Sequence, residues 1–389
     1  LRTFRERLGR LPPLNRGGER SIWVHAVSVG EVLAARGLVE SLKRRFPGRR
    51  VFLSTTTVTG NAVASQNVVA DGLFFAPFDW PGPVRRALEA VDPALLVLVE
   101  TELWPNLIHE ARRRGTRVAL VNGRISPRSF PRYRRLRGLL RDVLADVDLF
   151  LMQGEAHARR VREMGAPADR VRVLGNLKYD APPPRGGGPA SAIASEEGRP
   201  VWVAGSTAPG EEDQVLEAFR RARQRLPALR LVLAPRHPER FDEAAALVAA
   251  AAYRCARRSR LGAEGWRDGD VLLLDTMGEL AAAYGAATVV FVGGSLVPAG
   301  GHNVLEPAAL GRAIVVGPHM QNFQEIAEDF ASEGALVTVR SAEELAGAVV
   351  ALVEDEPRRA EMGRRARAVL ERHRGAVDAT VSALIGLVA

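Results

Sequence analysis

The segment from Phe291 to Pro307 reads FVGGSLVPAGGHNVLEP and decides the fold of this chain. An apolar strand over Ala287–Val292 is predicted to run into two glycine pairs, and then into a helix opened by His302 and Asn303. Backbone N–H groups beside a helix N-terminus are typical of a site for an anion such as a phosphate. Glu306, about one turn inside that helix, would accept hydrogen bonds from ribose hydroxyls. A glycine turn alone is often only a tight connection, but the composite predicts a nucleotide-sugar site.

Apolar runs bounded by turn residues alternate with helix-period segments, such as Glu31–Phe46 and Pro83–Ala90, along the whole chain. The strands predicted in the first half are Ile22–Val27, Val51–Ser54, Leu73–Ala76, Leu95–Val99, Val118–Val121, Leu149–Met152 and Val171–Leu174. Those predicted in the second half are Val201–Ala204, Leu229–Ala234, Val271–Leu274, Thr288–Val292, Ala313–Val316 and Ala335–Val339. This alternation predicts an α/β fold of parallel sheets with helices on both faces.

The pattern is interrupted at 181–200, where three consecutive prolines and three consecutive glycines are typical of a linker. We therefore predict two doubly wound, Rossmann-like domains, residues 1–180 and 201–389, facing a central cleft. A long helical tail is expected from about Pro357 to Leu387. Its last helices pack either on the second domain or back on the first. Ligands of such sheets bind outside the carboxyl ends of the strands, which places the expected site in the cleft.

The composition is that of a globular protein, with 47% hydrophobic and 25% charged residues in a chain of 389. The single cysteine, Cys255, excludes an internal disulfide framework and a cysteine-based metal cage, which fits the cytoplasm. No run of about 18 apolar residues occurs, so no membrane-spanning helix is predicted. The sequence begins at Leu1 rather than at methionine, which leaves an upstream anchor open.

The charge is divided unevenly between the two halves. Residues 1–190 carry 32 Lys and Arg against 18 Asp and Glu, a net of +14, whereas residues 191–389 carry 22 against 27, a net of −5. The basic half predicts an anionic partner: nucleic acid, an anionic membrane surface or a phosphorylated lipid. Leu1, Phe4 and Leu8 lie on one helical face among arginines, and Phe130–Arg141 interleaves apolar residues with five arginines. Both suit a bilayer interface, or equally a solvated helix over the edge of a core.

Polar residues and glycines stand where predicted strands end, in eight short motifs. These are His25–Glu31 (HAVSVGE), Glu100–Asn106 (ETELWPN), Asn122–Ser126 (NGRIS), Gly175–Asp180 (GNLKYD), Ala204–Thr207 (AGST), Pro235–Arg240 (PRHPER), Gly293–Pro307, and Gly317-Pro318 followed by Asn322-Phe323. Taken in this order, the motifs resemble the Kdo transferases of lipopolysaccharide synthesis, which are two-domain GT-B glycosyltransferases. The resemblance covers nearly the whole chain.

The resemblance implies that Kdo, an acidic eight-carbon sugar, passes from CMP-Kdo to a phosphorylated lipid A precursor (lipid IVA) with inversion. It also implies an enzyme on the cytoplasmic face of the inner membrane, anchored or peripheral, that needs no metal or other cofactor. Such a displacement needs a base on the acceptor hydroxyl, stabilisation of the departing phosphate, and tolerance of an oxocarbenium-like centre. Helix N-termini and a basic residue can take the place of a metal at a CMP leaving group.

Glu31 is the predicted base, because the resemblance places the family's catalytic carboxylate at this position. The structural alternative is a first-turn carboxylate favoured by the helix dipole. Glu100 matches a second important carboxylate of the family, and Glu102 lies close enough to be confused with it. One of these two is alternatively a cap for the helix expected near Trp104. The remaining residues predicted for the acceptor side are Ser28, Gly30, Asn122, Arg124 and Lys178, one of only two lysines among 52 arginines.

The predicted donor side holds nine residues: Ser206, Thr207, Arg236, His237, Gly278, Gly300, Gly301, Asn303 and Glu306. A guanidinium fork at Arg236 suits the CMP phosphate, and His237 is either a second contact or structural. Ser206 and Thr207 either cap the following helix or contact phosphate. Gly278 is expected to begin a helix whose backbone reads the cytosine or phosphate. The family usually has histidine where this chain has Ala208, which leaves position 208 out of the site.

Two other functions compete with this interpretation. One is another GT-B nucleotide-sugar enzyme, a UDP-sugar transferase or an epimerase, against which Glu100–Asn106 and Gly175–Asp180 argue. The other is a non-catalytic binder of anionic polymer. Aromatic residues make up only 6% of the chain and no nucleic-acid module is recognisable, so nucleic acid is not expected as a partner.

Overall fold

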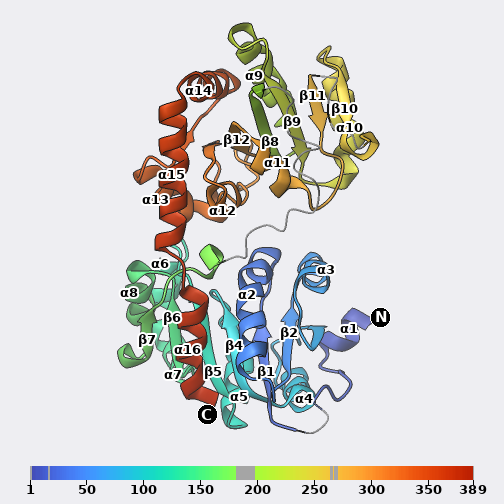
Figure 1. The fold of residues 1–389 in the computed structure, drawn as a ribbon. Coiled ribbons are helices and arrows are strands. Elements are labelled where there is room, and N and C mark those ends of the chain that lie inside the picture. The colour runs from blue at the N-terminus through green and yellow to red at the C-terminus, as the bar shows by residue number, and fades with distance from the viewer. Residues whose placement is uncertain (1, 16–17, 181–197, 263–265, 267–269, 389) are drawn as a thin grey trace. The chain divides into compact units, whose positions relative to one another are not determined.

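The computed structural model describes residues 2–15, 18–180, 198–262, 266 and 270–388. The predicted linker, 181–200, lies outside the described residues except for its last three positions. The chain forms two compact units (Figure 1): the first unit is Leu1–Ala181 with His373–Ala389, and the second unit is Pro182–Arg372.

The first unit is built on a seven-stranded parallel sheet in the order β3-β2-β1-β4-β5-β6-β7. Its strands are β1 Ser21–His25, β2 Val51–Thr55, β3 Gly72–Phe75, β4 Pro93–Val99, β5 Arg117–Gly123, β6 Leu149–Met152 and β7 Val171–Val173. Its α-helices are α1 Arg2–Arg7, α2 Val29–Arg45, α3 Val58–Asn67, α4 Pro81–Val91, α5 Pro105–Arg113, α6 Phe130–Arg135, α7 Arg137–Ala145, α8 Glu155–Met164 and α16 Ala376–Val388.

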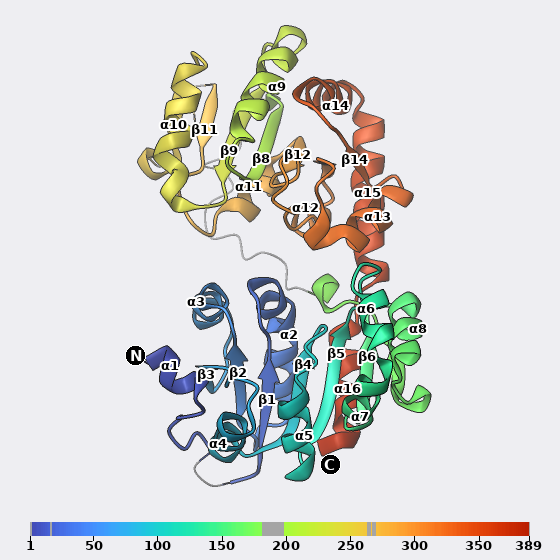
Figure 2. The ribbon, with the colours of Figure 1, turned by 180° about the vertical axis from the view of Figure 1, so that it is seen from behind.

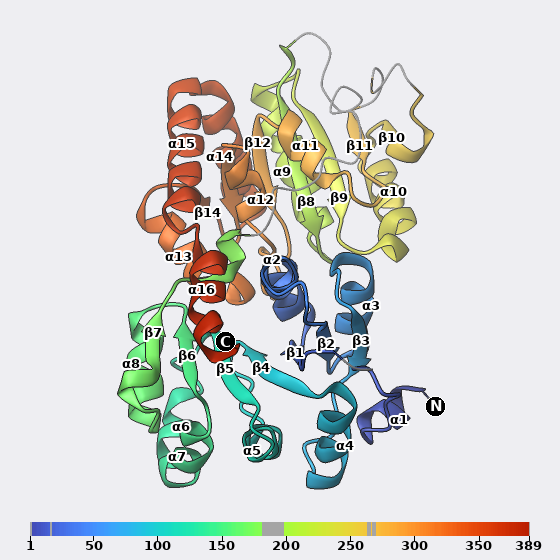
Figure 3. The ribbon, with the colours of Figure 1, turned by 60° about the horizontal axis from the view of Figure 1, so that its bottom comes forward.

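Helices cover both faces of this sheet. Because successive side chains of a strand point to opposite faces, a strand covered on both sides needs apolar residues throughout. In β1, Ile22 and Val24 pack into the core formed with α2, α3 and α16, whereas Trp23 packs into the core formed with α4, α5 and α8. All three side chains are fully buried. Figure 3 shows α2, α3 and α16 on one side of the sheet and α4 and α5 on the other.

The second unit contains another seven-stranded parallel sheet, in the order β10-β11-β9-β8-β12-β13-β14. Its strands are β8 Val201–Thr207, β9 Arg230–Pro235, β10 Cys255–Arg257, β11 Val271–Leu273, β12 Val289–Val292, β13 Ala313–Val316 and β14 Leu336–Thr338. Its α-helices are α9 Glu212–Arg225, α10 Phe241–Ala250, α11 Leu280–Ala286, α12 Leu305–Ala309, α13 Gln324–Ser332, α14 Ala342–Glu354 and α15 Glu356–Arg372. Helices α9, α10 and α14 share a core with this sheet (Figure 2). The predicted α/β class with two parallel sheets is confirmed.

The structure adds two details to the predicted elements. Strand β10 was not predicted, because Cys255-Ala256-Arg257 is a short, half-buried edge strand without an apolar run. The predicted helical tail consists of two helices, α15 and α16, with Gly375 between them at a φ of +101°, and only α16 belongs to the first unit. That left-handed conformation ends a helix. The carboxylate of Asp180 then accepts hydrogen bonds from Gly375 N at 2.7 Å and Val377 N at 2.6 Å, at the start of α16.

Candidate active site

Glu31 lies in the first turn of α2, directly after β1. Its Oε2 accepts from Val27 N at 2.8 Å, and its Oε1 accepts from Ser28 Oγ at 2.8 Å. Ser28 is the N-cap of the helix, and its Oγ accepts in turn from Glu31 N at 3.4 Å. This is a variant of the Ser-x-x-Glu capping box, in which the glutamate accepts from the backbone N–H of the residue before the N-cap. The carboxylate therefore has a structural task at the helix start, and it is also fixed at the carboxyl end of a central strand.

Three carboxylates gather at this end of the first unit's sheet. The pKa of Glu31 is raised to about 7, by burial first and also by the charges of Glu102 and Glu100, against the opposing effect of the hydrogen bonds from Val27 and Ser28. The pKa of Glu102 is also raised, by burial first and then by Glu100, although Trp104 Nε1 donates to Glu102 Oε2 at 2.7 Å. A carboxylate that titrates near neutral pH suits proton transfer.

Glu100 and Lys178 form a mostly buried ion pair, with 3.2 Å between Glu100 Oε1 and Lys178 Nζ. Glu100 adopts a left-handed φ of +61° in the turn after β4, a conformation that is uncommon for a residue with a side chain. Asn122, also left-handed at +55° and 1% exposed, accepts at its Oδ1 from Leu177 N at 3.0 Å. The Asn122 side chain thus holds the segment that carries Lys178.

His25 is a structural residue of this motif. Its Nδ1 lies 2.8 Å from Ser54 Oγ, which also accepts from Trp23 Nε1 at 2.7 Å. Burial lowers the pKa of His25 to about 4, so the imidazole is neutral. Its ring meets the Trp104 ring edge to face, with 5.0 Å between centroids. His25 therefore supports the tryptophan that donates to Glu102.

Neither glutamate caps the helix that follows Trp104. The cap of α5 is Asp79, whose carboxylate accepts from Asn106 N at 3.1 Å and from Leu107 N at 2.8 Å. Arg124 is half-buried after β5, and its carbonyl accepts from Thr101 Oγ1. Gly30 is exposed in the first turn of α2, where an added Cβ would meet only Ser28 Oγ, at 4.0 Å. Packing of the protein therefore does not require glycine at position 30.

On the donor side, Ser206 and Thr207 do not cap a helix. Both lie within β8, and α9 begins only at Glu212. Thr207 Oγ1 donates to Glu212 Oε1 at 2.8 Å, and Arg240 Nη1 donates to the same oxygen at 2.6 Å. These two buried hydrogen bonds to Glu212 join the end of β8 and the loop after β9 to the start of α9. Arg240 ends the Pro235–Arg240 motif but was not predicted as a site residue, and Glu212 was not identified from the sequence.

The glycine loop after β12 already surrounds a carboxyl group of the protein. The carboxylate of Glu211 accepts from the backbone N–H groups of Gly294, Ser295 and Leu296. The N–H groups of the first glycine pair, Gly293 and Gly294, were expected to face a phosphate, but they already donate hydrogen bonds to the protein. This pair therefore shapes the loop and does not bind phosphate through its N–H groups. The sequence signal that was missed is an acidic pair, Glu211-Glu212, shortly after the Gly-Ser-Thr motif.

The second glycine pair is needed for close packing. Gly300 and Gly301 have left-handed φ values of +95° and +72°. An added Cβ would lie 2.4 Å from the Asn322 side chain at Gly300, and 2.4 Å from Met320 Sδ at Gly301. Both glycines are buried, so the turn approaches the short helix at Gln321–Phe323.

Arg236, His237, His302 and Glu306 interact electrostatically, so the structure brings these four residues together. Burial first, and then the charges of Arg236 and His237, lower the pKa of His302 to about 4. Burial raises the pKa of Glu306, whereas a hydrogen bond from Asn303 and the charge of Arg236 lower it. Arg236 and His237 are exposed. A cation, a neutral imidazole and a carboxylate thus face one region of the second unit.

Helix α12 begins at Leu305, later than predicted. Asn303 Oδ1 accepts from Leu305 N at 3.1 Å, and its Nδ2 donates to Glu306 Oε1 at 3.2 Å. Asn303 therefore orders the helix start, and Glu306 lies in the first turn. Gly278, with a φ of +83°, lies in the turn before α11 and does not begin that helix.

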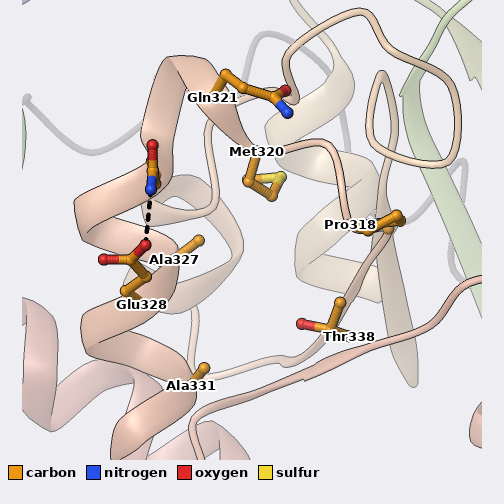
Figure 4. A pocket seen from close by; sticks show the side chains of 9 residues that line it. Pro318, Met320, Gln321, Ala327, Glu328, Ala331 and Thr338 are labelled. Atoms are coloured by element: carbon orange, nitrogen blue, oxygen red, sulfur yellow. Dashed lines mark hydrogen bonds between the residues drawn. The ribbon is translucent and has the colours of Figure 1, made fainter. Parts of the chain in front are cut away.

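A pocket of about 280 Å³ lies where β13 and β14 end, beside α13. Its lining residues are Gly317, Pro318, Met320, Gln321, Gln324, Ala327, Glu328, Ala331 and Thr338. Figure 4 shows these side chains, with a hydrogen bond of 2.8 Å from Gln324 Nε2 to Glu328 Oε1. Among the described residues, no group of three or more His, Cys, Asp or Glu is placed to hold a metal ion.

Comparison with known proteins covers both units. The family model for 3-deoxy-D-manno-octulosonic-acid transferase (kdotransferase) matches residues 2–181, and the model for glycosyl transferases group 1 matches residues 259–369. The 3-deoxy-D-manno-octulosonic acid transferase of Bordetella pertussis is 39% identical over 373 residues, 93% of this chain and 86% of the relative. The transferase of the same name from Haemophilus influenzae is 36% identical over 370 residues, 92% of this chain and 85% of the relative.

A solved structure with the same fold is UDP-GlcNAc 2-epimerase from Neisseria meningitidis bound to UDP-GlcNAc. Its TM-score is 0.62 over 94% of this chain and all of that chain, with 11% sequence identity. At that identity the likeness concerns the fold alone. It confirms the GT-B-like arrangement of two parallel sheets within one chain.

Proposed function

Because this chain belongs to the Kdo transferase family, glycosyltransferases of lipopolysaccharide synthesis, we propose that Glu31 is the base of its transfer reaction. In this proposal Glu31 takes the proton of the acceptor hydroxyl as the Kdo anomeric carbon leaves the CMP phosphate. The observation that carries the proposal is a carboxylate that is 8% exposed, held by Val27 N and Ser28 Oγ, with its pKa raised to about 7. Such a group is ionised often enough to accept a proton, and basic enough to keep it.

The donor is CMP-Kdo in this proposal. The exposed guanidinium of Arg236 binds the CMP phosphate, supported by its place beside His302 and Glu306. A planar guanidinium fork matches phosphate oxygens and stabilises their charge as the bond to Kdo breaks. Glu306, held by Asn303, accepts hydrogen bonds from the ribose hydroxyls.

The acceptor is a phosphorylated lipid A precursor. The net charge of +14 over residues 1–190 suits its phosphates. The Lys178–Glu100 pair holds a cation beside the carboxylate group that contains Glu31. Lys178 is therefore assigned to an acceptor phosphate or hydroxyl, and Glu100 to the orientation of Lys178.

The enzyme acts at the cytoplasmic face of the inner membrane in this proposal. Among the described residues, no helix is long and apolar enough to cross a bilayer. The aromatic patch, defined as Phe4, Phe78 and Trp80, places Phe4 (59% exposed) and Trp80 (61% exposed) at the surface of the first unit. Arg7 lies over the Phe78 ring of this patch. Exposed aromatic rings next to arginines suit the interface of an anionic membrane.

The test of the base separates catalysis from helix capping. In Glu31→Gln, the amide can still accept from Val27 N and donate to Ser28 Oγ, so the capping box is kept and the base is lost. We expect CMP binding to persist and Kdo transfer to a lipid A precursor, followed by mass spectrometry, to fall by about 10²-fold to 10⁴-fold. Comparing CMP with UDP binding also tests the donor.

The matched control is Glu344→Gln. Glu344 forms the same capping box at the start of α14, where its Oε2 accepts from Arg340 N at 2.8 Å and its N donates to Ser341 Oγ at 3.1 Å. This variant changes the same chemical group without touching the carboxylate cluster, so it should transfer Kdo normally. Near-normal turnover in Glu31→Gln would reject the assigned base.

A further inference from the structure

Glu211 joins the two loops that follow β8 and β12. It is 0% exposed, and its two oxygens accept four backbone hydrogen bonds. Oε2 accepts from Ala208 N at 3.0 Å and Gly294 N at 2.6 Å. Oε1 accepts from Ser295 N at 2.9 Å and Leu296 N at 2.8 Å. Four N–H groups that converge on one carboxylate form an anion site that the protein fills by itself.

No external anion fits in the same place. An added Cβ at Gly293 would lie 2.7 Å from Ser206 O and 2.8 Å from Glu211 Oε2, so the loop packs directly on the end of β8. Each N–H group that points inward is already paired. A donor phosphate must therefore bind elsewhere in the second unit.

The loop held by Glu211 also fixes the polar residues that follow it. Gly301 N donates to Gly294 O at 2.7 Å. An added Cβ at Gly294 would lie 2.8 Å from His302 Nε2, so the His302 ring packs against this glycine. Gly294 thus lies between the Glu211 carboxylate and His302. His302 comes three residues before α12, the helix that carries Glu306.

We propose that Glu211 is a positioning residue of the donor site, which holds the loop Gly293–Leu296 in the shape that places His302 and Glu306. It touches no substrate and acts only through this loop. The proposal rests on the proposed CMP-Kdo donor for its binding measurement, but not for its measurements of stability and exchange.

The first test is chemical rescue of Glu211→Ala. The truncation leaves four N–H groups around an empty space, and formate carries the carboxylate that was removed. We expect thermal stability and CMP affinity to fall, and sodium formate to restore both in a saturable manner, whereas sodium chloride at equal ionic strength does not. Glu217→Ala is the control, because Glu217 lies on the same helix, α9, and pairs only with the exposed Arg220 and Arg221.

The second test is Glu211→Gln, which keeps the size of the side chain. An amide has one accepting oxygen, so two of the four N–H groups would face its NH₂ group. We expect CMP affinity to fall about 10-fold to 100-fold in the folded variant, because the loop shifts the residues of the donor site. A folded Glu211→Gln with wild-type CMP affinity would overturn the proposal, and so would formate that is no better than chloride on Glu211→Ala.

Hydrogen exchange of the wild type keeps the proposal testable if neither variant folds. The amides of Ser295 and Leu296 should exchange as slowly as those of β12, although they lie in a loop. Fast exchange at these two amides would contradict the proposal. If the wild type fails to bind CMP, the proposed donor is wrong, but the formate rescue of stability and the exchange rates still decide the role of Glu211.

Discussion

The carboxylate of Glu31 caps a helix, and it also has a raised pKa that suits a catalytic base. As part of a capping box with Ser28, it stabilises the start of α2. As a buried group near Glu100 and Glu102, it resists ionisation. The capping contacts fix its position, and burial moves its pKa towards neutral. One residue can therefore serve both the fold and the proposed chemistry, without strain in either.

The first prediction concerns the pH dependence of transfer. The proposed base works only when it is ionised, and its pKa is raised to about 7. We therefore expect kcat to rise with pH through about 7 and to level off above it. Rates measured between about pH 5.5 and 8.5, with thermal melts to verify folding at each pH, check this. A flat profile over that range would argue that Glu31 does not titrate in the rate-limiting step.

The second prediction concerns stability. Because the folded state raises the pKa of Glu31 from 4.5 to about 7, its neutral form stabilises the protein below about pH 4.5, and this stability is lost as pH rises through about 7. Glutamine stays neutral at all these pH values, so Glu31→Gln does not lose this stability as pH rises. The variant should exceed the wild type by roughly 1–3 kcal/mol at pH 8, and by little near pH 4. Thermal melting of both proteins across this range measures the difference, and an equal difference at both pH values would count against the raised pKa.

The sequence was enough to identify Glu31 but not Glu211. Glu31 was identified because a resemblance pointed to it, and its place at the start of the predicted helix after the first strand already indicated a first-turn carboxylate. Its electrostatic environment was not readable, since Glu100 and Glu102 approach only through the pairing of β1 with β4. Glu211 was missed because three of its four partners lie more than eighty residues away along the chain. Only the fold brings them together.

At the scale of elements, the strand-to-helix turns of the two units differ in how much space they leave for a side chain in place of glycine. The turns at Gly300 and Gly301 are filled by Asn322 and Met320. The turn at Gly30 is open to solvent. Glycine is thus needed for packing at two of these positions, and we propose that position 30 is kept open for a ligand that approaches the backbone.

The third prediction tests this with Gly30→Ala. The substitution improves helix propensity by up to about 1 kcal/mol, so stability should be unchanged or slightly higher. We expect kcat/KM for the lipid acceptor to fall by at least about tenfold, because a methyl group enters the approach to Glu31. Gly37→Ala is the control on the same helix, where a Cβ would make only an ordinary contact of 3.6 Å with Val377. Full activity in Gly30→Ala would show that the acceptor does not approach this turn.

The elements themselves were largely predictable. Strands such as β4 and β12 are continuous apolar runs, because they are covered on both faces. Short or polar elements were not: β10 lacks an apolar run, and the start of α12 depends on the Asn303 side chain. The break between α15 and α16 turns on one left-handed glycine.

At the scale of the whole molecule, charge divides the chain into a basic and an acidic half. This was readable from the sequence, since it needs only counting. The aromatic patch was not readable, because it depends on α1 being held by Glu6, which accepts from Phe75 N at 2.9 Å. That contact leaves Phe4 exposed beside Phe78 and Trp80.

The fourth prediction concerns membrane association. The protein should sediment with vesicles that contain anionic lipid, and release should be nearly complete when salt rises from about 0.05 to 0.5 M, because screening shortens the reach of the arginines. Phe4→Ser with Trp80→Ser should weaken binding at low salt, whereas Val69→Ser, an equally exposed apolar residue outside the aromatic patch, should not. Equal binding to neutral vesicles would contradict the electrostatic part of the proposal.

The placement of α16 has a consequence for biosynthesis. This last helix contributes Ala376, Val377, Val381, Leu384 and Val388 to a core, and the other buried members of that core precede residue 180. A ribosome therefore makes the second unit, in full, before the first can bury that apolar face. Until α16 has been made, the nascent first unit exposes the apolar face that this helix covers in the folded protein.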